Sequence, residues 1–93
     1  MEIKPIANPL VVFREEFDDW AILFDPESGK AFGINPIGAR IWSKLDGKHD
    51  LSEIVQHIQN FFDNVSLDVE AHVGKFINDL VKNGLAGYEG VNE

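Results

Sequence analysis

The chain has 93 residues, 44% of them hydrophobic and 11% aromatic, and its 16 acidic and 8 basic residues give a net charge of −8. This length and composition indicate one folded domain, and the acidic balance argues against nucleic acid or an anionic membrane as a partner. The absence of cysteine excludes disulfides, thiolate metal sites and cysteine nucleophiles. Because no stretch has the pattern of a signal peptide or a membrane span, we expect a cytoplasmic protein.

The first third of the chain favours β-strands. β-Branched and aromatic residues gather in three short segments, Leu10–Phe17, Trp20–Asp25 and Lys30–Asn35. Asp18-Asp19 fits a hairpin turn between the first two segments. The segment from Asp25 to Gly29, with proline early and glycine late, fits a turn between the second and third. The pattern predicts a three-stranded antiparallel meander.

The first helix is predicted directly after these strands. Asn35-Pro36 has the character of an N-cap followed by proline at the first helical position, where a missing N–H costs nothing. Asp46-Gly47 is the expected end of this helix. Its apolar positions follow helical spacing and are Ile37, Ile41, Trp42 and Leu45.

Two further helices are predicted in the rest of the chain. One starts at Asp50, with Glu53 as its capping-box partner, and has the apolar face Leu51, Ile54, Val55, Ile58, Phe61 and Phe62. The last starts at Ser66, ends at a left-handed cap at Asn83-Gly84, and has the apolar face Val69, Val73, Phe76, Ile77, Leu80 and Val81. The tail after this cap is expected to fray.

The predicted elements together define an α+β fold, a three-stranded antiparallel sheet followed by three helices, similar to a winged helix-turn-helix. Three short strands cannot bury both faces, so the helices should cover one side of the sheet. We expect a single domain over residues 1–93, with a core from about Leu10 to Ala86.

Catalysis is not indicated by any motif. Gly33 and Gly38 are spaced as in a phosphate loop, but Ala39-Arg40 stands where a Walker loop has lysine and serine or threonine. No two of His49, His57 and His72 have the i, i+4 spacing of a helical metal pair, and no serine lies in a nucleophile elbow. We therefore expect no enzyme, no cofactor and no metal.

A nucleic-acid-binding or transcriptional module is one alternative, because a winged helix-turn-helix can bind DNA. Such a protein needs a basic recognition helix. The third predicted helix has Lys75 and Lys82 against Asp68, Glu70 and Asp79. This neutral to acidic balance disfavours DNA binding.

The third predicted strand offers a different use of the same architecture. If this strand is a sheet edge, small Ala31 and Gly33 leave its backbone approachable, and a peptide could add there as a fourth strand. Alternatively, a helix covers this edge and Gly33 is a bulge or a packing site. The pattern alone leaves both interpretations open.

The order of several landmarks resembles the PqqD family of small peptide chaperones, which bind precursors of ribosomally made, post-translationally modified peptides. The landmarks Ile34-Asn35, Ile41-Trp42, Asp46-Gly47 and Gly84-Leu85 occur within "WAILFDPESGKAFGIN", "PIGARIWSKLDGKHDLSEIV" and "VGKFINDLVKNGLAG". The resemblance covers Leu10 to Ala86. One departure is the segment from Pro36 to Ala39, where family members often have threonine and alanine.

The resemblance implies a non-catalytic chaperone that captures a leader peptide on the third strand, against the third helix. It also implies a partner enzyme, commonly of the radical S-adenosylmethionine type. The implied peptide-binding residues are Lys30, Ala31, Phe32, Gly33 and Ile34 on the strand, and Val69, His72, Val73, Lys75 and Phe76 on the helix. We expect a monomer in dilute solution.

Overall fold

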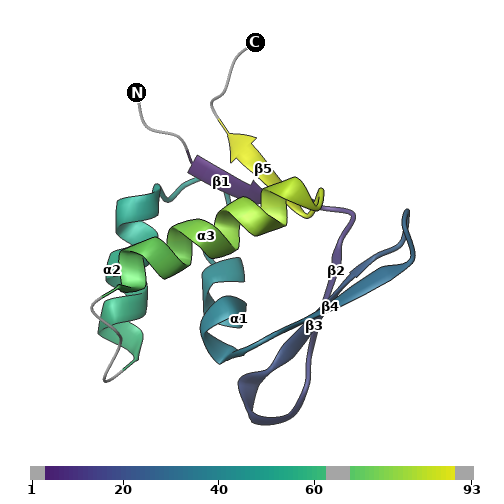
Figure 1. Cartoon of the computed structure of the whole chain (residues 1–93), viewed down its shortest axis with the longest axis horizontal. Coiled ribbons are helices and arrows are strands. Elements are labelled where there is room, and N and C mark those ends of the chain that lie inside the picture. The colour runs from purple at the N-terminus through teal and green to yellow at the C-terminus, as the bar shows by residue number, and fades with distance from the viewer. Residues whose placement is uncertain (1–3, 63–67, 90–93) are drawn as a thin grey trace.

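A computed structural model gives the architecture and describes residues 4–62 and 68–89 (Figure 1). Its elements in chain order are β1 (Lys4–Ala7), β2 (Val12–Glu15), the 3-10 turn η1 (Phe17–Asp19), β3 (Ala21–Asp25), β4 (Lys30–Ile34), α1 (Pro36–Trp42), α2 (Leu51–Phe61), α3 (Val69–Lys82) and β5 (Ala86–Glu89). The predicted α+β class, with three strands followed by three helices, is confirmed. In the described part of the chain, no helix is long and apolar enough to cross a membrane.

The predicted meander is present as the antiparallel sheet β2-β3-β4, with β3 in the middle. The hairpin turn contains Asp18 and Asp19, whose φ angles of 57° and 68° lie in the left-handed region that aspartate tolerates better than most residues. Gly29 closes the second turn with φ 77°, and its N–H donates to the Asp25 carbonyl at 2.8 Å. The first strand is shorter than expected, because regular pairing covers Val12–Glu15 alone.

One face of this sheet is buried and the other is open. Strand alternation puts Leu23, Phe32 and Ile34 on the inner face, toward the helices. Leu23 and Ile34 are buried there, beside core residues of α1 and α3 such as Ile41 and Val73. The helices therefore cover one side of the sheet, as predicted.

A second sheet was not expected from the sequence. β1 and β5 pair antiparallel, with Ile6 opposite Gly87, so the prediction that the tail after Asn83-Gly84 frays was wrong for Ala86–Glu89. The predicted cap explains the change in direction: Gly84 has φ 76°, and the Leu85 N–H donates to the Leu80 carbonyl at 2.8 Å. Leu85 is buried beneath this cap and leads the chain into β5, alongside β1 (Figure 1).

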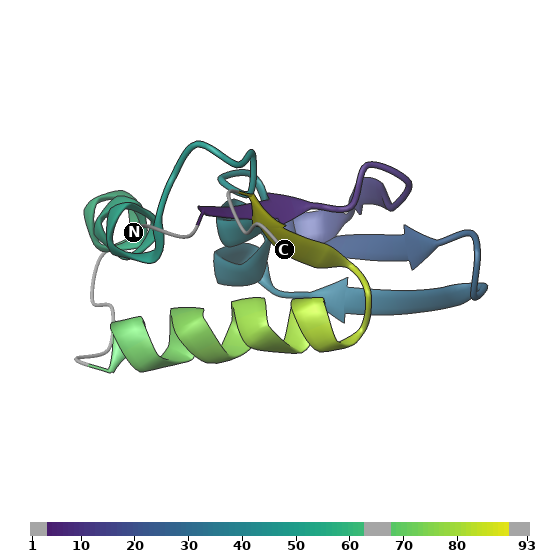
Figure 2. The same cartoon turned by 90° about the horizontal axis from the view of Figure 1, so that it is seen from above.

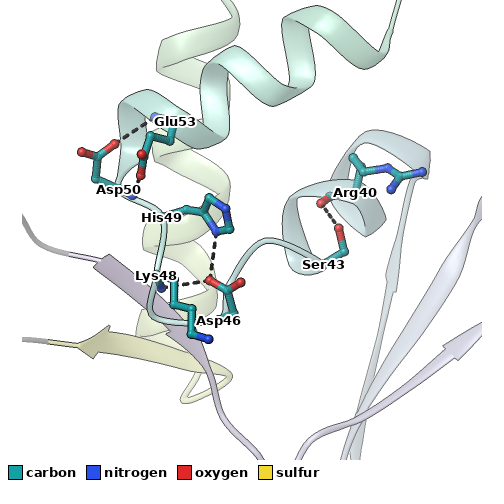
Figure 3. Close-up of polar contacts among 7 residues, drawn as sticks. All are labelled: Arg40, Ser43, Asp46, Lys48, His49, Asp50 and Glu53. Atoms are coloured by element: carbon teal, nitrogen blue, oxygen red, sulfur yellow. Dashed lines mark hydrogen bonds and ion pairs between the residues drawn. The ribbon is translucent and has the colours of Figure 1, made fainter.

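The starts of α1 and α2 match their predicted caps. The Asn35 side chain accepts a hydrogen bond from the Gly38 N–H at 2.7 Å, and Pro36 is the first helical residue. Asp50 and Glu53 form the complete capping box at the start of α2 (Figure 3). The described part of α3 begins at Val69 after Asp68, and the predicted start at Ser66 lies outside the described residues.

The end of α1 was predicted too late. The helix stops at Trp42 instead of reaching Asp46-Gly47, and Leu45 is buried in the turn that follows. The reason is a contact with the N-terminal strand: the Ala7 N–H donates to the Leu45 carbonyl at 2.8 Å, and Asp46 bridges to Ile6. These backbone groups serve the distant strand and do not continue the helix.

The loop between α1 and α2 is organised by Asp46. Its carboxylate accepts a hydrogen bond from the Lys48 backbone N–H at 2.9 Å and contacts His49 Nδ1 at 3.0 Å (Figure 3). Burial opposes ionisation of Asp46, but these contacts outweigh it and lower the pKa of its carboxyl group. The loop thus fixes α2 relative to α1.

Candidate functional site

The strand β4 is an edge of its sheet, as one of the two interpretations of the sequence required. It pairs with β3 on one side and has no strand partner on the other among the described residues. Ala31 and Gly33 are exposed, and a Cβ atom built on Gly33 would meet no atom within 4 Å. The outer face of β4 is therefore open at Gly33, and the backbone of this glycine is exposed to solvent.

A groove of about 380 Å³ lies between α1 and α3, at the end of β4. Viewed from above, β4 is the strand of its sheet nearest to α3 (Figure 2). The groove is mostly apolar, and its lining residues are Asn35, Ile37, Gly38, Ile41, Val69, His72, Val73 and Phe76. The site thus combines an accessible strand edge with a neighbouring apolar groove.

Four of the five candidate residues on α3 line this groove, and Lys75 does not. Lys75 lies on the exposed side of the helix, where its Nζ contacts Asp79 Oδ2 at 3.1 Å. His72 is exposed and lines the groove together with Val69 and Phe76. Val69 and Val73 are almost fully buried, and they serve the core as well as the groove wall.

The candidate residues on β4 divide between the two faces of the sheet. Ile34 is buried and Phe32 is half-buried on the inner face, whereas Lys30, Ala31 and Gly33 are exposed. Side-chain contacts of a bound strand with Phe32 and Ile34 would lie on the side of the groove, and those with Ala31 and Gly33 on the open face. All five residues thus lie along the β4 edge, but two of them face the helices and three are exposed to solvent.

The α1 side of the groove was not predicted. Asn35, Ile37, Gly38 and Ile41 line it, although helical spacing had assigned the two isoleucines to an ordinary apolar face. Gly38 has a particular role, because a Cβ atom there would lie 3.1 Å from Phe76 Cζ. Glycine at this position lets the Phe76 ring approach α1 closely and so sets the width of the groove.

His57 lies on α2, and its imidazole ring is partly buried. Burial lowers the pKa of His57, and the nearby positive charges of Lys44, Arg40 and His49 lower it further. Its Nε2 atom is buried and finds no hydrogen-bond partner among the described residues. His57 stacks with Phe61 at a centroid distance of 5.9 Å, on the far side of α1 from the groove. It therefore belongs to the packing of α2.

Among the described residues, no three histidine, aspartate or glutamate side chains gather in a way that could hold a metal ion. The polar groups of the groove are likewise few, namely the Asn35 amide and the His72 imidazole. The Asn35 Oδ1 atom already accepts a hydrogen bond from the Gly38 N–H. The arrangement can bind apolar side chains and offer backbone hydrogen bonds.

This fold and site define a class of protein: a small α+β binding module of winged-helix type, with an accessible strand edge next to an apolar groove. The family model described as "Coenzyme PQQ synthesis protein D (PqqD)" matches residues 21–86, a stretch that contains β3, β4 and all three helices. The chain belongs to the PqqD family, which confirms the resemblance inferred from the sequence.

Solved structures with the same fold agree with this assignment. The structure of TbiB1 in complex with the TbiA(beta) leader peptide has a TM-score of 0.72 and 28% identity, covering 95% of this chain and 99% of that one. The lasso peptide synthetase B1 complexed with a leader peptide has a TM-score of 0.74 and 21% identity, covering 90% and 98%. The heterocyclase TruD, at 12% identity and a TM-score of 0.66, has the fold within 12% of its chain. Comparison with curated protein sequences finds no match.

Proposed function

We propose that this protein is a peptide chaperone that binds the leader of a ribosomal precursor peptide as an added strand on β4. The observation that carries this proposal is the edge strand β4, exposed at Gly33, beside the groove between α1 and α3. Main-chain hydrogen bonds to β4 would supply affinity, and every second side chain of the peptide would supply specificity.

The alternation of β4 defines how the peptide side chains are divided. Side chains of the added strand that share the face of Phe32 and Ile34 point toward the helices and the groove. The groove wall of Ile37, Val73 and Phe76 favours apolar side chains at these peptide positions. Peptide residues on the other face lie beside Ala31 and Gly33, where small side chains impose little selection.

The likeness to leader-peptide complexes supports this proposal. TbiB1 is 28% identical over almost the whole length of both chains, and its structure contains the TbiA(beta) leader peptide. The lasso peptide synthetase B1 was also solved with a leader peptide, and adds support at the level of the fold. The nucleic-acid alternative is less favoured, because Lys75 of α3 pairs with Asp79 in a chain of net charge −8.

The chaperone would deliver the peptide to a separate modifying enzyme and carry out no chemistry itself. We infer a peptide-modifying partner, and the radical S-adenosylmethionine type is the one implied by family resemblance. The groove has two polar side chains, Asn35 and His72, and its composition suits binding better than proton transfer. A short precursor gene and an enzyme gene next to this one would identify the two partners.

Titration with the neighbouring precursor peptide, followed by amide NMR, tests the binding site. We expect shifts from Lys30 to Asn35 and from Val69 to Phe76, because these segments form the edge and the groove. Amides of α2 from Glu53 to Gln56 lie outside the groove and serve as the internal control. Strong shifts in α2 with β4 unchanged would show that the peptide binds elsewhere.

A further inference from the structure

The outer face of the β2-β3-β4 sheet points away from the helices and carries mostly apolar positions. Register and strand alternation give two cross-strand rows on this face, Val12–Phe24–Ala31 and Arg14–Ile22–Gly33. Val12 and Phe24 are 53% and 40% exposed, so the described chain leaves this face uncovered. The solvent-facing side of an antiparallel sheet is normally polar, whereas here Arg14 alone has a polar side chain.

The chemistry of this outer face fits another protein surface. A hollow of about 330 Å³ lies among Val12, Arg14, Ile22, Phe24 and Ala31. The Arg14 Nε atom contacts Glu16 Oε2 at 2.8 Å, so the one cation of the face is already partly neutralised. Aromatic and arginine side chains of this kind dominate the binding energy of protein interfaces. A nucleic acid would instead need a net positive surface.

The size of the outer face argues against a stable pair of copies of this chain. Strands of about five residues give a length of about 17 Å, and three strands give a width of about 14 Å, on the order of 250 Å². A stable interface needs about 800 Å² from each partner. Contact through this face alone is therefore too small for a lasting complex, and a stable partner has to contact the neighbouring surface as well.

We propose that the outer face, Val12, Arg14, Ile22, Phe24 and Ala31, docks an apolar surface of the peptide-modifying enzyme. This inference rests on the proposed function, because a leader strand on β4 widens the same face by one strand. Ala31 and Gly33 project little from β4, so the outward side chains of the peptide would lie directly beside the apolar outer face. The enzyme then contacts the chaperone and its bound peptide together.

The test uses the full chain with the precursor peptide and the modifying enzyme encoded beside its gene. The double variant Val12→Ser/Phe24→Ser removes the exposed apolar pair, and Leu51→Ser/Phe61→Ser is the matched control on α2, with 36% and 52% exposure. We expect peptide modification at limiting chaperone to slow at least fivefold in the first variant. Leader affinity, measured by fluorescence anisotropy, should stay within twofold of the wild type in both variants.

Three outcomes would overturn the inference. Unchanged modification, or an equal loss in both double variants, removes the outer face as the docking surface. Loss of leader affinity in Val12→Ser/Phe24→Ser assigns the face to peptide binding, and a wild-type dimer that this variant dissolves in sedimentation assigns it to a second copy. If the double variant does not fold, Val12→Glu on the edge strand β2 replaces it. A wild-type protein that binds no leader contradicts the proposed function instead.

Discussion

The sheet β2-β3-β4 has two edges, and the chain treats them differently. The β2 edge has Arg14 and Glu15 within the strand and Glu16 directly after it, and charged side chains of this kind discourage pairing with another strand. The β4 edge has no charge after Lys30, and it has exposed Ala31 and Gly33. An apolar groove lies at the end of β4. The accessibility of an edge thus depends on the side chains along that strand, and this difference is why we propose peptide addition at β4 and not at β2.

The largest effect that we expect is a loss of leader affinity when proline is placed on the β4 edge, with little change when it is placed on the β2 edge. Gly33→Pro removes a backbone N–H and crowds β4, so we expect leader affinity to fall at least tenfold, the effect of losing about 1.4 kcal/mol. Glu15→Pro on β2 should change leader affinity less than twofold. Fluorescence anisotropy gives the affinities, and circular dichroism establishes that both variants fold. Equal affinities of a folded Gly33→Pro variant and the wild type would rule out strand addition at this position.

The groove can be tested separately from the edge. Phe76→Ala removes a half-buried ring from the groove wall, and we expect leader affinity to fall about tenfold because apolar contact area is lost. Phe61→Ala removes an exposed ring from α2 and is the matched control. Calorimetric titration of both variants measures the difference. If Phe61→Ala weakens binding as much as Phe76→Ala, the groove between α1 and α3 is not the binding surface.

The partly buried His57 on α2 should make the stability of the protein depend on pH. Because burial lowers the pKa of His57 in the folded protein, the unfolded chain binds its proton more readily, and stability falls as pH drops below about 6.5. Above that pH the imidazole is neutral in both states and contributes no pH dependence. We expect His57→Gln to flatten the decrease in melting temperature between pH 7 and pH 5.5, measured by thermal denaturation. A decrease of the same size in His57→Gln would assign it to other groups, and His72→Gln on α3 is the control.

The sequence predicts those parts of the fold that depend on local residues. The turns at Asp18-Asp19 and Gly29, the caps at Asn35 and Asp50, and the left-handed Gly84 all follow from backbone preferences of single residues. The pairing of β1 with β5 was missed because its two strands lie at opposite ends of the chain and carry no local turn signal. The strand β1 also explains the early end of α1, because the Ala7 N–H binds the Leu45 carbonyl.

Only part of the candidate site could be predicted, because the rest again depends on how distant segments pack together. Helical spacing identifies an apolar face, but it does not distinguish the part buried in the core from the part that lines a groove. Ile37 and Ile41 have the same spacing, yet Ile37 is 38% exposed and Ile41 is 2% exposed. Gly38 stood out in the sequence for its loop-like spacing, whereas its contact with Phe76 depends on how α3 packs across α1. The width of the groove is thus a tertiary property.

The smallest effect that we expect comes from Lys75, on the side of α3 that faces away from the groove. Lys75 lies one residue from Phe76, but its ammonium group pairs with Asp79 on the exposed side of the helix and does not line the groove. An exposed i, i+4 pair contributes about 0.3–0.5 kcal/mol, so Lys75→Ala should cost about this much stability. Leader affinity should change less than twofold, while His72→Ala at the groove should lower it more. A larger loss in Lys75→Ala than in His72→Ala, measured by the same calorimetric titration, would mean that the peptide contacts the outer side of α3. The difference between the β4 and β2 edges would then not be enough to explain binding, because the binding surface would also include the exposed, charged side of α3.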